Sequence, residues 1–235
     1  KNEFLSQIEA ALGLVGSSRL DMPETGVAEL PSCFAVTDLA VASIAAAAGQ
    51  LGALTGAREI TVDRRLAALW FDMTLRPEGW KLPDPWDPIA GVYRTTDGWI
   101  RLHTNAPHHR DAALRVLDCA AEKEAVARAV ANWQKSKLEV AIVQEQGAAA
   151  ALHSMAEWAA HPQGQAVATQ PLIAWNDIAD GAAAKALRDL KVLDLTRVLA
   201  GPVATRFLAG YGAQGLRIDP PWWSEPGVEP EVTLG

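Results

Sequence analysis

The stretch that decides the fold of the C-terminal part runs Lys191-Val-Leu-Asp-Leu-Thr-Arg-Val-Leu-Ala-Gly-Pro-Val-Ala-Thr-Arg-Phe-Leu-Ala-Gly-Tyr-Gly-Ala213 and continues into Gln214-Gly-Leu-Arg-Ile-Asp219. Two apolar runs typical of buried strands lie near its ends: Val192, Leu193 and Leu195, then Leu216 and Ile218. Between them, apolar residues recur at helical spacing. The stretch therefore predicts a βαβ unit with a right-handed crossover.

The turn and the helix of this unit have local signals of their own. Pro202 is expected at the first helical position, where its missing N–H is tolerated. Gly212 is expected to adopt the left-handed conformation that ends a helix. A turn from a strand into a helix presents free N–H groups, which is how open α/β sheets bind nucleotide phosphates.

The residues from Val192 to Pro221 resemble the opening of the family III CoA-transferases, the carnitine dehydratase/bile-acid-inducible group. The resemblance rests on the strand, the run Arg197-Val-Leu-Ala-Gly-Pro202, the following helix and Gly212-Ala213; members usually have Glu-Val where this chain has Gln214-Gly215. It implies a Rossmann-like parallel-sheet domain that binds coenzyme A or acyl-CoA. The residues that it implies for CoA contact are Val198, Leu199, Ala200, Gly201, Pro202 and Arg217.

Length and charge limit the classes of function. The chain has 235 residues and a formal net charge of −7, which argues against a nucleic-acid or anionic-membrane surface. No window approaches 18 consecutive apolar residues, so we expect no membrane span and a cytoplasmic protein. Cys33 and Cys119 form no metal-binding pair, and the group His103, His108 and His109 lacks zinc-ligand spacing. We expect no metal.

Asp38 is the candidate catalytic residue. It stands at the start of a predicted alanine-rich helix from Thr37 to Leu54, followed by Thr55-Gly56 and a strand at Ile60–Asp63. In the family that this order resembles, the matching Asp is the nucleophile, although Ala42 replaces a usual Gly. An alternative interpretation is that Asp38 only caps the helix, where a side-chain oxygen accepts from free N–H groups.

The middle of the chain predicts a small α+β domain. Val92–His103 reads as a hairpin that turns at Asp97-Gly98. Helical patterns follow at about 106–117, 122–133 and 137–146, after an irregular Pro- and Trp-rich stretch, residues 77–90. The predicted organisation is residues 1–75 as the Asp-helix segment, 76–175 as the small domain, 176–190 as a linker and 191–235 as an incomplete CoA-binding βαβ.

The resemblance implies transfer of CoA between two carboxylic acids through an anhydride and a thioester on Asp38. Two alternatives stay open: a racemase or isomerase of acyl-CoA thioesters, and a non-catalytic half that binds a partner domain. The Asp segment precedes the βαβ, which reverses the family order, so we expect a tandem, permuted or split member. Two strands alone cannot bury a parallel sheet, and we expect a homodimer or a tandem pseudo-dimer completed by chain beyond Gly235.

Overall fold

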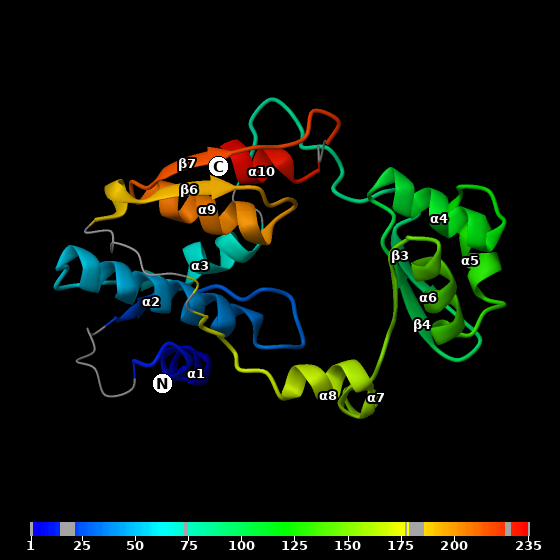
Figure 1. Cartoon of the computed structure of the whole chain (residues 1–235), viewed down its shortest axis with the longest axis horizontal. Coiled ribbons are helices and arrows are strands. Elements are labelled where there is room, and N and C mark those ends of the chain that lie inside the picture. The colour runs from blue at the N-terminus through cyan, green and yellow to red at the C-terminus, as the bar shows by residue number, and fades with distance from the viewer. Residues whose placement is uncertain are drawn as a thin grey trace. The chain divides into compact units, whose positions relative to one another are not determined.

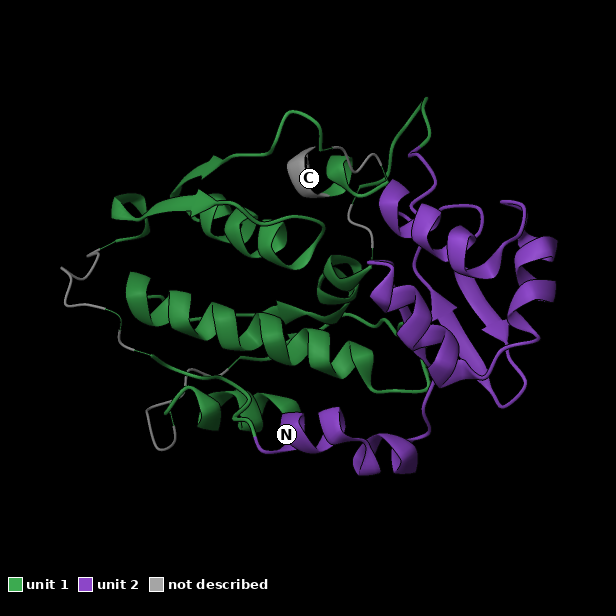
Figure 2. Ribbon diagram, turned by 45° about the vertical axis from the view of Figure 1, so that its right-hand side comes forward, with its two compact units in different colours: residues 1–81, 170–235 green, residues 82–169 purple. Residues whose placement is uncertain are grey.

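The computed structural model of the chain is of the mixed α/β class, with short parallel and antiparallel sheets among its helices (Figure 1). It describes residues 2–14, 22–72, 75–176, 178, 186–223 and 227–234. Two compact units form: Lys1–Lys81 with Gln170–Gly235, and Leu82–Thr169 (Figure 2). We call them unit 1 and unit 2. The expected linker at 176–190 and the polar connector near Gly16 fall largely outside the described residues.

Unit 2 contains the small domain expected from the hairpin signal. Strands β3 (Gly91–Arg94) and β4 (Trp99–Leu102) pair antiparallel, with Arg94 opposite Trp99, so the turn at Asp97-Gly98 is confirmed. A third strand, β5 (Ala149–Ala151), pairs with β4 and extends the hairpin into a three-stranded sheet. The helices of this unit are α4 (Pro107–Leu117), α5 (Lys123–Val130), α6 (Lys135–Gln144), α7 (Met155–Ala160) and α8 (Pro162–Ala168).

The core of unit 2 forms between this sheet and its helices. Its fully buried side chains include Ile89, Ile100, Leu102, Val126, Val130, Leu138 and Ile142. Leu138 and Ile142 lie four residues apart on α6, so one face of that helix contributes both. The Tyr93 hydroxyl closes the cluster by donating a 2.7 Å hydrogen bond to the Ile89 carbonyl oxygen.

The first part of unit 1 consists of three helices and two very short strands. They are α1 (Glu3–Ala11), β1 (Glu24–Thr25), α2 (Val36–Thr55), β2 (Val62–Asp63) and α3 (Arg64–Phe71). Strands β1 and β2 pair in parallel. The second core cluster centres on α2, where Ala40, Val41 and Ala45 pack with Val62 and Ala67. The expected alanine-rich helix is therefore confirmed, and its small side chains allow close approach of its neighbours.

Helix α2 is the one helix in the described part of the chain that is long and apolar enough to cross a membrane by length and composition. This is weak evidence for a span, because buried core helices pass the same test. In this fold 39% of its most apolar window is buried against the rest of the chain.

The predicted βαβ unit forms in the second part of unit 1. Strands β6 (Lys191–Asp194) and β7 (Gln214–Arg217) are parallel neighbours, and α9 (Ala200–Gly210) connects them. A 3-10 turn at Leu187–Asp189 precedes β6, and α10 (Glu229–Leu234) follows the unit. Gly212 has φ 102°, as expected for a helix end. Helix α9 begins at Ala200, so the expectation of Pro202 as its first residue was wrong by two positions.

The prediction that the strands of this unit are buried was wrong. Leu193 and Leu195 are 59% and 56% exposed, and Leu216 and Ile218 are 61% and 52% exposed. Side chains alternate between the two faces of a strand, and Asp194, on the other face of β6, is buried against α9. The sheet of β6 and β7 thus has one covered face and one bare apolar face.

The remaining helix of unit 1, α3, packs on α9. The Trp70 and Phe207 rings meet edge to face with centroids 6.4 Å apart, and the Arg206 guanidinium lies 4.5 Å from the Trp70 ring centroid. The Glu231 carboxylate accepts a 2.8 Å hydrogen bond from the Leu75 N–H. These contacts join the two sequence segments of unit 1.

Candidate functional site

Asp38 lies in the first turn of α2, as the sequence predicts, but it does not cap the helix. The cap residue is Ala35, and no side chain caps it. The neighbouring Thr37 uses its hydroxyl oxygen to accept a 2.8 Å hydrogen bond from the Leu30 N–H. The capping interpretation of Asp38 is therefore wrong.

The Asp38 carboxylate is bound by Arg64, which begins α3. The Arg64 Nη1 donates to Asp38 Oδ1 at 2.8 Å. The Asp38 side chain is 47% exposed, whereas that of Arg64 is only 14% exposed. A half-exposed carboxylate is thus held by a largely desolvated cation, which strengthens their attraction relative to a pair in open water.

Arg64 contacts three further acceptors on the segment that contains β1. Its Nε donates to the Ala28 carbonyl oxygen at 2.9 Å, its Nη1 also donates to Glu24 Oε1 at 3.0 Å, and its Nη2 binds the Glu29 carboxylate. The bonds to Asp38 and Glu29 raise the pKa of Arg64 from its ordinary value. Arg64 therefore carries a permanent positive charge among three carboxylates.

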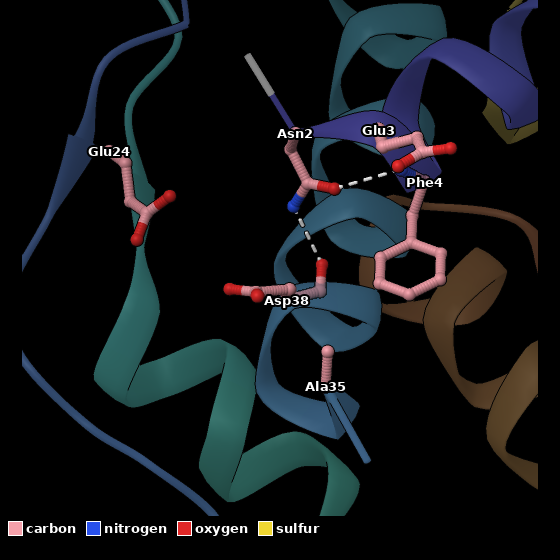
Figure 3. A pocket seen from close by; sticks show the side chains of 6 residues that line it. All are labelled: Asn2, Glu3, Phe4, Glu24, Ala35 and Asp38. Carbon is pink, nitrogen blue, oxygen red and sulfur yellow. Dashed lines mark hydrogen bonds between the residues drawn. The ribbon is translucent and has the colours of Figure 1, made fainter.

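A surface pocket of about 490 Å³ opens beside Asp38 and is lined by Asn2, Glu3, Phe4, Glu24, Ala35 and Asp38 (Figure 3). Asn2 fixes one wall. Its Oδ1 accepts the Phe4 N–H at 3.0 Å, which caps α1, and its Nδ2 donates to the Asp38 carbonyl oxygen at 2.8 Å. In Figure 3 the Asp38 carboxylate extends from α2 toward the side of the pocket on which Glu24 lies.

The second candidate element, the turn from β6 into α9, has an unusual backbone. Val198 adopts φ 66°, in the left-handed region. A β-branched residue there is a conformational outlier, because its side chain crowds the backbone. Val198 and Leu199 are 50% and 49% exposed, so the strain is not relieved by burial in the core.

Gly201 serves the packing of this turn. A Cβ at this position would lie 2.1 Å from Thr196 Oγ1 and 2.3 Å from Thr196 Cβ. Ala200 is exposed and Pro202 is fully buried. The space that Gly201 leaves is therefore filled by the Thr196 side chain, while the exposed atoms of the turn belong to residues 198–200.

Arg217 and Arg197 flank this turn on β7 and after β6. Arg217 forms a two-pronged ion pair with Asp219, with Nε–Oδ2 at 2.8 Å and Nη2–Oδ1 at 3.2 Å. The Arg197 guanidinium stacks on the Trp223 ring, 5.0 Å from its centroid. Arg217 thus already has an anionic partner of its own.

The structure places all the predicted site residues in unit 1 but in two groups. Among the described residues, those that line the Asp38 pocket come from α1, β1 and the start of α2, and none comes from the turn at 198–202. Within the described part of the chain no group of three His, Cys, Asp or Glu side chains could hold a metal ion. His108 and His109 stack on each other in unit 2, where burial and the two neighbouring histidines lower the pKa of His109.

Comparison with known proteins identifies the second group. The model of CoA-transferase family III matches residues 187–227, which include β6, the turn, α9 and β7. This chain belongs to CoA-transferase family III. The match explains why the βαβ sequence is the most specific stretch of the chain.

A curated relative in this family is the acetyl-coenzyme A transferase nodX of Hypoxylon pulicicidum, 28% identical over 159 residues. The alignment covers 57% of this chain and 27% of the relative, so the chain spans about a quarter of that protein's length. Two solved structures are also similar. Rv3272 of Mycobacterium tuberculosis gives a TM-score of 0.45 at 16% identity, over 69% of this chain and 49% of that one. A CAIB/BAIF family protein of Brucella suis gives 0.39 at 14% identity, over 66% and 50%.

The Arg64 cluster is the part of the site that sequence reasoning missed. Arg64 lies 26 residues from Asp38 and 40 from Glu24, and no local motif links these positions. The one available signal was the position of Arg64 directly after the strand that follows Thr55-Gly56.

Proposed function

We propose that this chain takes part in CoA transfer between two carboxylic acids, with Asp38 as the nucleophile. The observation that carries the proposal is the state of the Asp38 carboxylate. One of its oxygens is held by Arg64, and the side chain is half-exposed on a pocket at the start of α2. A carboxylate is ionised at neutral pH and needs no base to attack a thioester.

The proposed chemistry has three steps. Asp38 Oδ2 attacks the thioester carbonyl of the donor, the C–S bond breaks, and a mixed anhydride and the CoA thiolate form. The thiolate then attacks Asp38 Cγ, which releases the donor acid and leaves a CoA thioester on Asp38. The acceptor carboxylate attacks the thioester carbonyl to expel the thiolate and form a second anhydride, whose acceptor acyl group the thiolate takes to regenerate Asp38.

We place the CoA contact at the exposed residues Val198, Leu199 and Ala200, with Gly201 and Pro202 shaping the turn and Arg217 on the next strand. The strained φ of Val198 supports this placement, because strain in exposed backbone occurs preferentially at ligand sites. The start of α9 also offers unpaired N–H groups, and no side chain caps it.

A charge at Leu199 tests the CoA contact. Leu199→Asp places a carboxylate where the phosphates of CoA would lie, whereas Leu199→Asn has almost the same shape without the charge. By calorimetry with free CoA, we expect the Asp variant to bind about tenfold more weakly than the Asn variant, or about 1.4 kcal/mol. Equal affinities of the two variants would remove the turn from the CoA site.

Asp38→Asn tests the nucleophile while keeping an oxygen for Arg64 to bind. We expect transfer activity to fall by about 10⁴-fold or more, as for other essential nucleophiles. Hydroxylamine added during turnover should trap Asp38 as a hydroxamate in the unmodified chain, which a racemase would not show. Asp72→Asn is the matched control, because Asp72 is an exposed carboxylate paired with Arg76 outside the pocket.

One observation favours the second candidate, a non-catalytic half. The pocket beside Asp38 also carries Glu3 and Glu24, and negative side chains disfavour an anionic acid substrate. In that case Asp38 is a structural partner of Arg64. Full transfer activity in Asp38→Asn, with no hydroxamate on the unmodified chain, would establish this alternative.

We further propose that the sheet of β6 and β7 is completed by other strands, either in a homodimer or in a tandem pseudo-dimer within one longer polypeptide. The bare apolar face of this sheet supports the proposal, because two parallel strands alone are not stable in water. A cytoplasmic location fits acyl-CoA substrates and belongs to the same proposal.

A further inference from the structure

Arg64 is held in place without the help of Asp38. Three acceptors outside α2 bind its guanidinium: the Ala28 carbonyl oxygen at Nε, Glu24 at Nη1 and Glu29 at Nη2. Its side chain is 14% exposed. The guanidinium would therefore keep its position when Asp38 loses its charge.

The two oxygens of Asp38 are not equivalent. Oδ1 accepts from Arg64 Nη1 at 2.8 Å, whereas no described residue donates to Oδ2. A carboxylate that reacts as a nucleophile forms its new bond with the oxygen that is free. In an anhydride made through Oδ2, Oδ1 becomes the carbonyl oxygen, and it already faces a fixed donor.

We propose that Arg64 is a catalytic residue that stabilises negative charge on Asp38 Oδ1 when Asp38 Cγ is attacked. This inference rests on the proposed function. When the CoA thiolate attacks the anhydride, the Cγ–S bond forms and the Cγ=Oδ1 electron pair moves onto Oδ1. As that pair returns, the Cγ–Oδ2 bond breaks and the donor acid leaves as a carboxylate. Arg64 donates to Oδ1 throughout and transfers no proton.

The same contact opposes the first step. Asp38 loses its negative charge when it attacks the donor thioester, and Arg64 stabilises the charged form. Arg64 therefore slows formation of the acyl adduct and speeds its conversion into the CoA adduct. A donor fixed before the reaction is worth about 10²- to 10³-fold in rate at an oxyanion, so the gain in the second step is the larger effect.

Rapid-quench mass spectrometry of the full chain with acetyl-CoA separates the two steps. The acetyl adduct and the CoA adduct on Asp38 have different masses. In Arg64→Met we expect the acetyl adduct to form at least as fast as in the unmodified chain, and the CoA adduct about 100-fold more slowly. Arg65→Met is the matched control, because Arg65 is the next residue, is 67% exposed and pairs only loosely with Asp63 at 3.8 Å.

Loss of the Arg64 anchor also removes contacts that hold residues 24–29, so folding is checked by thermal unfolding. If Arg64→Met does not fold, Arg64→Lys keeps the positive charge but cannot bind all four acceptors. The lysine variant should also accumulate the acetyl adduct, to a smaller extent. A CoA adduct formed at the unmodified rate in either folded variant overturns the role of Arg64.

Asp38→Asn distinguishes this failure from failure of the proposed function. If that variant forms both adducts at the unmodified rate, Asp38 is not the nucleophile and both proposals are wrong. If it forms neither adduct while Arg64→Met forms both at the unmodified rates, Asp38 keeps its role and only the inference about Arg64 is wrong.

Discussion

Thr205 Oγ1, on α9, donates a 2.6 Å hydrogen bond to Asp194 Oδ2 at the end of β6. Asp194 is buried, and its Oδ1 accepts from both the N–H and the hydroxyl of Thr196, at 2.8 and 2.5 Å. Burial opposes ionisation of Asp194, but the hydrogen bonds from Thr196 and Thr205 together lower its pKa below the ordinary value. The ionised Asp194 therefore ties the strand, the turn and the helix together.

We predict that Thr205→Val destabilises the chain by about 2 kcal/mol at pH 7, the usual worth of a hydrogen bond to a charged group. A group whose pKa is lowered by folding contributes stability above its unfolded pKa, about 3.9 for Asp, and loses it as the pH falls through the folded value. Urea unfolding should thus show a smaller penalty at pH 3 than at pH 7. Thr205→Ser, which keeps the hydroxyl, should lose little at either pH.

Gly201→Ala should destabilise the βαβ unit, because its Cβ would lie 2.1 Å from Thr196 Oγ1. Overpacking of this kind costs about 1–3 kcal/mol. Gly210→Ala is the control in the same helix, because a Cβ there meets nothing within 4 Å. We expect the control to unfold at the same urea concentration or a slightly higher one. Equal behaviour of the two variants would contradict the account of Gly201 as a packing residue.

Glu157 in unit 2 should titrate far below an ordinary glutamate. The Ser154 N–H and the Lys135 ammonium both donate to its carboxylate, at 2.6 and 3.0 Å, and lower its pKa from 4.5 to about 2. Ser154 in turn accepts from the Glu157 N–H, which completes a capping box at the start of α7. The stabilisation that Glu157 gives is present above pH 4.5 and is lost as the pH falls toward 2.

Side-chain carbon NMR can follow this titration. In Lys135→Met the midpoint of Glu157 should move up toward the ordinary value, because one of the two principal donors is gone. Lys137→Met, an exposed lysine on the same helix α6, should leave it in place. A midpoint near 4.5 in the unmodified chain would show that the capping box does not persist in solution.

Local signals made much of the fold predictable. The hairpin at Asp97-Gly98, the alanine-rich α2 and the βαβ connection all depend on neighbours within a few residues, and each formed. Strand β5 (Ala149–Ala151) was missed, because an alanine run lacks the β-branched and aromatic residues that mark strands. It is a strand because β4 offers it an edge, which is a tertiary cause.

The candidate site was predictable only in part for the same reason. The positions of Asp38 and of the turn at 198–202 follow from local pattern and family resemblance. The pairing of Asp38 with Arg64 brings together residues that no periodicity connects, and the left-handed φ of Val198 contradicts its local preference. Long-range charge pairing and backbone strain are both set by the assembled fold.

The bare face of the β6–β7 sheet carries the last prediction. Leu193 and Leu216 lie opposite each other in register, and both side chains are mostly exposed. We expect the isolated chain to self-associate through this face. Replacing both residues with threonine preserves strand preference but removes apolar area, so the weight-average mass measured by analytical ultracentrifugation should fall toward that of the monomer.

The control replaces Val140 and Val143 on α6, which are exposed to a similar extent, 54% and 53%, but belong to a helix. Their backbone groups are already paired within the helix, so they offer apolar area without an open strand edge. Association through the sheet requires both features, and the threonine pair on α6 should therefore leave the mass unchanged. If both pairs lower the mass equally, general apolar exposure drives association, and the proposal that other strands complete the sheet loses its support.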